Sequence, residues 1–255
     1  MLVRQFFTIL HHYLQYNSGG MRRILLICIF MFAAFGLSAQ TDTSSASQPM
    51  KQGLTRFTAI DVDAPIKLIL TKIDEYDVPY IIYDTKEVYT SKFSFDVDRN
   101  GVLKIRERSD SKRESITEVE VFYNTLDTII ISKADVTANG VIATTLLDIE
   151  ISSDAHFTAE IDTLDLKISL TGQSVVELNG SALYQTADIS TGLYSAINLK
   201  TMSATVFASH NAHIMVDASQ RLEAKTATGG LISYKSKPEI YREDVSLFGG
   251  EVKQL

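Results

Sequence analysis

The sequence predicts an all-β fold, a β-solenoid wound from coils of about 19 to 20 residues. The main observation is a repeated pair: an aliphatic residue or Ala is followed at once by Ser or Thr, six times, at intervals of 20, 19, 19, 19 and 19 residues. Strand-like residues flank every pair, and no helical stripe lies between them. A solenoid requires such a period because each turn places equivalent residues one above another. The pairs are Ile131-Ser132, Ile151-Ser152, Leu170-Thr171, Ile189-Ser190, Ala208-Ser209 and Ala227-Thr228.

Residues 1–39 are predicted to be an upstream extension followed by a signal peptide. A methionine and two arginines start at Met21, an apolar run follows over 24–36, and small residues precede an expected cleavage after Ala39. The apolar run is shorter than the roughly 20 residues that a membrane-spanning helix needs. We interpret 1–20 as an extension from a start codon assigned too far upstream, which would make Met21 the true start; the alternative is Met1. The expected location is the periplasm, the outer cell surface or the medium, with no stable membrane span after cleavage.

The net charge limits the classes of binding partner, and the cysteine content limits disulfide formation. Removal of residues 1–39 takes away three of the 24 basic residues and none of the 31 acidic ones, so the net charge falls from −7 to −10. An acidic chain of this kind argues against nucleic acid and anionic membrane surfaces as partners. The single cysteine, Cys28, lies inside the predicted signal core, so the mature domain is expected to contain no disulfide.

The polar stretch 40–53 is predicted to be a flexible linker, and 54–255 a single β-helix domain with regular coils over about 126–240. The domain opens with an alternating run at 57–70, which suits one buried face. An Asn-Gly dipeptide at Asn100 predicts a tight hairpin, and the charged run 106–115 a solvated loop. These opening coils have no clean period and are expected to cover the N-terminal end of the stack. Further strand candidates are 78–83, 93–97, 102–105 and 119–123.

Two columns of residues are predicted to line the interior of the regular coils. The first member of each pair is aliphatic or Ala throughout, and the residue two before it is apolar in five of six coils. Residues two apart lie on the same strand face, so both columns form continuous ladders. The exception is Lys225, which predicts that the last coil is frayed or exposed as a cap, with 246–255 helping to close the end.

The Ser/Thr column is interpreted as structural, with hydroxyls bonded along the ladder. The next column is too mixed for a flat hydroxyl array that binds sugar or ice. It reads Lys133, Ser153, Gly172, Thr191, His210 and Gly229. Glycines and short polar residues in this region predict one bend per coil with residues of positive φ.

Two histidines are candidate surface residues. His156 and His213 are 57 residues apart, which is three coils of 19, so their imidazoles are expected on one side of the rod, roughly 14 Å apart. This distance excludes a shared metal site, and no metal or cofactor is expected.

An enzymatic role is the alternative reading, because polysaccharide lyases and hydrolases also use parallel β-helices. Such sites need clustered carboxylates with a basic neighbour. The best candidates are Asp148, Glu150, Lys167 and Asp188, which the register places outward on adjacent coils. A solvated face with cross-strand ion pairs explains the same four residues, and we expect no catalytic residues.

The chain resembles a known bacterial family at several points. The features are the predicted signal peptide, an opening F-T-A-I-D-V-D strand, a later N-G-V-L-K-I strand, and short coils with I-S-x-x-A or T-G-Q-S corners. Over 57–247 it is similar to the family called putative auto-transporter adhesin, head GIN domain, formerly a domain of unknown function. The resemblance implies a right-handed parallel β-helix, export and an adhesin-like role without an established activity. We therefore expect an exported binding or structural module for glycan or protein.

Overall fold

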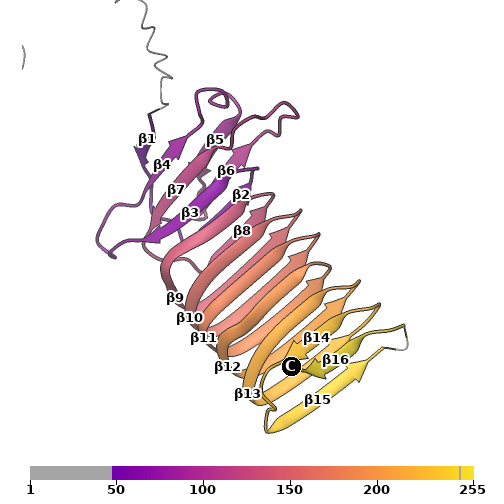
Figure 1. Ribbon diagram of the computed structural model, residues 1–255. Helices are drawn as coiled ribbons and strands as arrows, with labels where there is room; N and C mark the ends of the chain where they lie inside the picture. Colours follow the sequence, from indigo (N-terminus) through magenta and orange to yellow (C-terminus); the bar gives the residue numbers. More distant parts are fainter. Residues whose placement is uncertain (1–47, 247) are drawn as a thin grey trace, which may run out of the picture. The chain divides into compact units, whose positions relative to one another are not determined.

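The computed structural model describes residues 48–246 and 248–255, so the predicted signal peptide and upstream extension lie outside the described residues. The described chain is a right-handed parallel β-solenoid of about seven turns (Figure 1). This confirms the fold class that the 19-residue period predicts. Its strands are β1 (Met50–Gly53), β2 (Ala59–Asp63), β3 (Lys67–Lys72), β4 (Tyr80–Asp84), β5 (Phe93–Val97), β6 (Val102–Glu107), β7 (Glu118–Tyr123), β8 (Thr128–Ser132), β9 (Asp135–Ser152), β10 (His156–Thr171), β11 (Val175–Ser190), β12 (Leu193–Ser209), β13 (His213–Thr226), β14 (Leu231–Tyr234), β15 (Ile240–Val245) and β16 (Glu251–Gln254).

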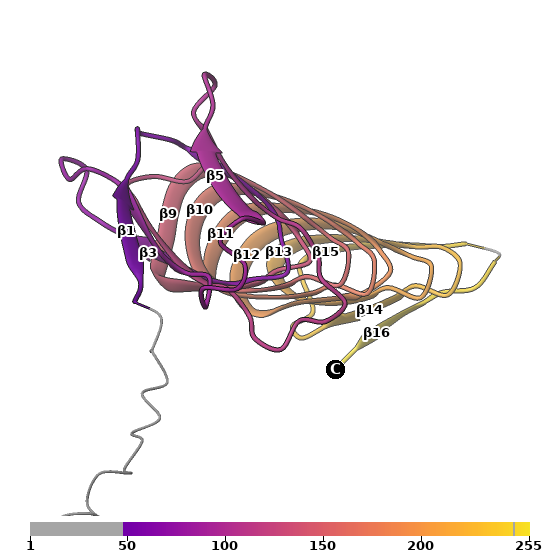
Figure 2. The same ribbon diagram turned by 90° about the horizontal axis from the view of Figure 1, so that it is seen from above.

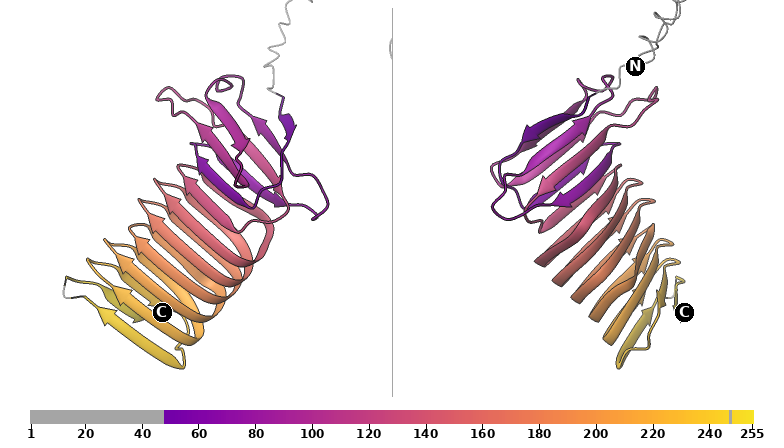
Figure 3. Two further views of the ribbon diagram at one scale, coloured as in Figure 1. Left: turned by 180° about the vertical axis from the view of Figure 1, so that it is seen from behind. Right: turned by 60° about the vertical axis from the view of Figure 1, so that its left-hand side comes forward.

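The long strands β9 to β13 bend once and contribute to two faces of the solenoid (Figure 3). We call the face that carries β1, β4, β7, β3 and the first halves of the long strands the first face; β14 and β16 continue it. The second face carries β5, β6, β2, β8, the second halves of the long strands and β15. Seen from above, the turns lie one behind another around a common interior (Figure 2).

The interior spine follows the predicted register. Ile131 pairs with Ile151, Ile151 with Leu170, and Leu170 with Ile189, all in parallel ladders. Each of these four side chains is at most 2 % exposed. Burial of an aliphatic side chain of this size contributes about 1.5–3 kcal/mol, so the stacked column is a main source of stability.

The last regular coil departs from the prediction by one residue. Ala208 pairs with Thr226 instead of Ala227, and Lys225 lies opposite Phe207 on the outside. Two register shifts between β12 and β13 shorten this coil to 18 residues at that point. The coil therefore keeps an apolar interior position at Ala224, and the expected fraying at Lys225 is wrong. Closure of the end by the C-terminal segment is confirmed, since β16 pairs with β14.

The mixed column after the Ser/Thr residues has one shared property, a left-handed backbone. All six members have a positive φ, from +49° at His210 to +81° at Gly229. Non-glycine residues adopt this region infrequently, so backbone geometry at the corner explains why the column is chemically mixed. The predicted positive-φ bend in each coil is confirmed.

The hydroxyl column itself is in register, as Thr171, Ser190 and Ser209 pair in sequence. In the described part of the chain these hydroxyls do not bond directly to one another. Instead Nδ1 of His210 lies 3.2 Å from Oγ of both Ser190 and Ser209. The predicted ladder of hydroxyl bonds is thus replaced here by one bridging imidazole.

The opening coils are stacked in an order that differs from the order of the sequence. β3 lies between β7 and β9, and β2 lies between β6 and β8. The predicted strands are present, but the run 57–70 forms two strands, β2 and β3, on different faces. The Asn-Gly hairpin between β5 and β6 is also present. In its turn Gly101 has a φ of +73° and Asn100 has no positive φ, so the turn is not the type I′ turn that Asn-Gly favours in two-residue hairpins.

Strand β1 lies inside the stretch that the sequence predicts as a linker. It pairs antiparallel with β4, and the ammonium of Lys51 lies 3.7 Å from the centre of the Tyr80 ring. All four β1 residues are exposed, so main-chain bonds and not burial hold the strand. Polar composition alone therefore cannot distinguish this edge strand from a linker, and the described unit begins before residue 54.

A buried ion pair connects β6 to the charged loop that follows it. The carboxylate of Glu107 lies 2.5 Å from the guanidinium of Arg113 and accepts a hydrogen bond of 2.5 Å from the hydroxyl of Thr117. The Glu107 side chain is fully buried and that of Arg113 is 13 % exposed. The guanidinium also lies over the buried Tyr89 ring, 4.1 Å from its centre. The loop is thus mostly solvated, as predicted, but one arginine anchors it to the core.

Candidate functional site

The four charged residues predicted from the sequence lie outward on the second face, as expected. Asp148 and Lys167 are paired on neighbouring strands, with 3.4 Å between carboxylate and ammonium. Glu150 and Asp188 lie in the next outward column, with Ser169 between them. Two strand intervals separate these two acids by about 9.6 Å along an exposed ladder. The structure therefore brings together one ion pair, not a cluster of carboxylates.

The two predicted histidines lie in one column of the first face, as the 57-residue spacing indicates. Val175 and Leu193 lie between His156 and His213 in the register. Nε2 of His213 lies 3.2 Å from the Ser233 hydroxyl. Burial, with a smaller contribution from a nearby lysine, lowers the pKa of His213 below its ordinary value. The two imidazoles are therefore too far apart to bind one ligand together.

Among residues 48–246 and 248–255, no group of three His, Cys, Asp or Glu side chains is placed to hold a metal ion. No helix in this part of the chain is long and apolar enough to cross a membrane.

A groove on the first face is the candidate binding site, and we call it the acidic groove. It has a volume of about 350 Å³ and lies over the outward residues of β3, β4 and β7. Ile69 and Ile82 supply apolar surface, and carboxylates surround them. A stacked pair of rings, Tyr80 and Phe122, lies one outward row away, with 4.1 Å between ring centres. The groove is lined by Pro49, Lys67, Ile69, Ile82, Tyr83, Asp84, Glu118, Val119 and Glu120.

Hydrogen bonds fix the charged groups around the acidic groove. Nζ of Lys86 lies 2.8 Å from Asp84 and 2.9 Å from Glu118, and these bonds raise the pKa of Lys86 above its ordinary value. Glu120 accepts a hydrogen bond of 2.9 Å from the Thr71 hydroxyl, while Lys67 has no ion pair in the described residues. The groove therefore offers carboxylate acceptors and a free ammonium beside apolar surface.

Sequence reasoning missed this groove because its strands are distant in the chain. The alternation in 67–72 and 118–123 indicates which side chains point outward. It does not indicate that β3 and β7 are neighbours, some 50 residues apart, or that β4 joins them antiparallel. The sequence does contain one indication of the groove: Ile69 and Ile82 are apolar although they occupy outward positions of their strands.

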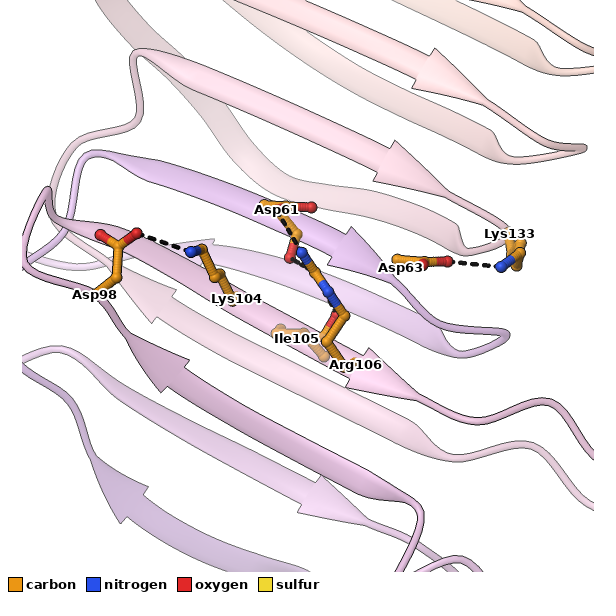
Figure 4. Close-up of polar contacts among 7 residues, drawn as sticks. All are labelled: Asp61, Asp63, Asp98, Lys104, Ile105, Arg106 and Lys133. Atoms are coloured by element: carbon orange, nitrogen blue, oxygen red, sulfur yellow. Dashed lines mark hydrogen bonds and ion pairs between the residues drawn. The ribbon is translucent and has the colours of Figure 1, made fainter.

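On the second face of the opening coils, charged residues are already paired with one another (Figure 4). Arg106 donates to the carboxylate and to the backbone oxygen of Asp61, at 2.5 and 2.7 Å. Lys133 lies 2.8 Å from Asp63. Lys104 lies 3.0 Å from Asp98, and the bond from Lys104, together with a backbone amide, lowers the pKa of Asp98. The charges on this face are paired with one another, whereas Lys67 in the acidic groove has no ion pair in the described residues, and the groove adds apolar surface.

Solved structures support the fold. A putative adhesin from Bacteroides fragilis NCTC 9343 is 18% identical, with a TM-score of 0.72, over 82% of this chain and 96% of that one. A putative lipid binding protein from Parabacteroides distasonis ATCC 8503 is 15% identical, with a TM-score of 0.65, over 83% and 98%. A putative adhesin from Parabacteroides merdae ATCC 43184 is 17% identical, with a TM-score of 0.59, over 83% and 97%.

No curated protein matches the chain. A family model, described as "Putative auto-transporter adhesin, head GIN domain", matches residues 56–238, most of the described solenoid. The chain therefore belongs to the family of putative auto-transporter adhesins with a head GIN domain.

Proposed function

We propose that the protein is an exported, non-catalytic binding module of adhesin type, and that its acidic groove binds a glycan. The observation that carries the proposal is the combination of apolar floor and fixed carboxylates in one groove. Sugar rings present C–H surface on one side and hydroxyl donors around their edge. Ile69 and Ile82 can contact the C–H surface of a sugar, and the carboxylates of Glu118 and Glu120 can accept hydrogen bonds from its hydroxyl groups.

Membership of the adhesin family supports a binding role, as does the position of the groove on an open face. A volume of about 350 Å³ lies near the lower end of the range for small-ligand sites, so the groove suits a short glycan segment. The acids predicted as enzymatic candidates lie on the other face. There Asp148 is engaged by Lys167, and Ser169 separates Glu150 from Asp188.

Substitution Glu120→Gln tests the groove. We expect it to weaken glycan binding at least about tenfold, because a charge-assisted hydrogen bond is replaced by a weaker neutral one. A glycan array first identifies the ligand, and calorimetric titration then measures the affinity of both proteins.

The matched control is Glu177→Gln, which changes an exposed glutamate in the same outward column, beyond the groove. The control should bind as tightly as the unchanged protein. Equal affinities for all three proteins would place the ligand elsewhere, and an array without any specific signal would reject the glycan.

A further inference from the structure

Two outward columns on the second face carry charges in an order that is complementary to its own reverse. Within the chain Asp148 pairs with Lys167, and Glu223 pairs with Arg221 and Arg242. Column 1 consists, in coil order, of Leu146, Asp165, Tyr184, Ser203, Arg221 and Ile240. Column 2, over the same six coils, contains Asp148, Lys167, Thr186, Thr205, Glu223 and Arg242, and it continues to Thr128 on β8. Over these six coils, both columns are complementary to their own reversed sequences.

In column 1, reversal places Leu146 opposite Ile240 and Asp165 opposite Arg221. Leu146 and Ile240 are both apolar and are 60 % and 49 % exposed, and Asp165 and Arg221 carry opposite charges. The centre of the reversal falls between Tyr184 and Ser203.

In column 2, reversal about the same line places Asp148 opposite Arg242 and Lys167 opposite Glu223. The two central threonines, Thr186 and Thr205, lie opposite each other. All six charged residues of the two columns thus meet the opposite charge, with the same centre in both columns. A single two-fold rotation would therefore bring complementary residues together in both columns.

We propose that this face binds a second copy of the chain in an antiparallel homodimer. The two-fold axis runs parallel to the strands, between the coil of Tyr184 and the coil of Ser203. That axis lays each column over its own reversed copy, which is the isologous contact of a symmetric dimer. The facing sheets are then about 10 Å apart, a normal distance for stacked sheets.

The neighbouring outward column limits the interface. There the same axis places Glu150 opposite Asp244, which are both acidic, so the contact ends before this column. On the other side the exposed Leu164 and Leu183 lie at the bend beside column 1 and extend the apolar part. The contact spans about 24 Å along the stack and covers roughly 500 Å² per partner, so the dimer is weak and concentration-dependent.

Asp165 is the best residue to test, because it is exposed and has no ion-pair partner in the described residues. Sedimentation velocity over a concentration series, on the protein as isolated from expressing cells, measures dimerisation. Asp165→Arg should weaken the dimer at least about tenfold, because Arg then faces Arg221. Arg221→Asp should weaken it similarly, and the double exchange should restore affinity to within about threefold.

Glu177→Arg, on the first face, is the control and should dimerise like the unchanged protein. Raised salt should weaken the dimer of the unchanged protein, since the facing charges are at the surface. A protein that stays monomeric up to roughly 0.2 mM overturns the proposal. So does a double exchange that dimerises no better than the single variants, or an Asp165→Arg variant that dimerises as before.

Discussion

Replacement of Glu107 by Ala should destabilise the domain by about 3–5 kcal/mol, because removal of one partner leaves a buried charge uncompensated. The Arg113 side chain is 13 % exposed, and no other acidic side chain in the described residues forms an ion pair with it. The hydroxyl of Thr117 loses its acceptor as well. Urea unfolding followed by circular dichroism measures the change in free energy.

The matched control is Asp63→Ala, which breaks the ion pair with Lys133 on the surface. Both side chains of that pair are 47 % exposed, so its loss should cost at most about 1 kcal/mol. Equal costs for the two substitutions would show that the loop containing Arg113 does not anchor the opening coils.

Replacement of Gly180 by Ala should cost about 3 kcal/mol or more. Gly180 has φ of +105°, and an added Cβ would lie 2.1 Å from the backbone oxygen of Ile161 on the neighbouring coil. Backbone strain of this kind costs about 1–3 kcal/mol, and the clash requires a shift between β10 and β11 in addition. The thermal midpoint should fall by several degrees.

Gly53→Ala serves as the comparison, because no atom lies within 4 Å of the Cβ position there. Its effect should stay within about 0.5 kcal/mol. A Gly180→Ala protein as stable as the Gly53→Ala protein would mean that β10 and β11 are not in the close contact described above.

The regular half of the fold was predictable because a solenoid repeats a local rule. Alternation decides which residues point inward, and the 19-residue period decides which of them stack. Together these two patterns identify the column from Ile131 to Ile189 without any long-range information. The rule failed where coil length changed, at Ala227, since register shifts between β12 and β13 leave no mark in the hydrophobic pattern.

The opening coils and the candidate site were less accessible to sequence reasoning. Insertion of β3 between β7 and β9 depends on which edges meet, and no local pattern records this. The acidic groove is formed by three such strands, so its residues could not be grouped beforehand. Alternation alone indicates that the surface candidates point outward. Which of them pair, such as Lys167 with Asp148, depends on the register of neighbouring strands.

The parallel stacking of successive coils is the central claim, and disulfide formation between engineered cysteines measures it directly. In a chain with Cys28→Ser, the pair Ser169→Cys with Asp188→Cys should oxidise readily, since paired residues on adjacent strands are about 4.8 Å apart. The pair Ser169→Cys with Thr186→Cys is offset by two residues, about 8 Å, and should remain reduced. Oxidation of the offset pair, with none in the matched pair, would contradict the register on which the fold and both surfaces depend.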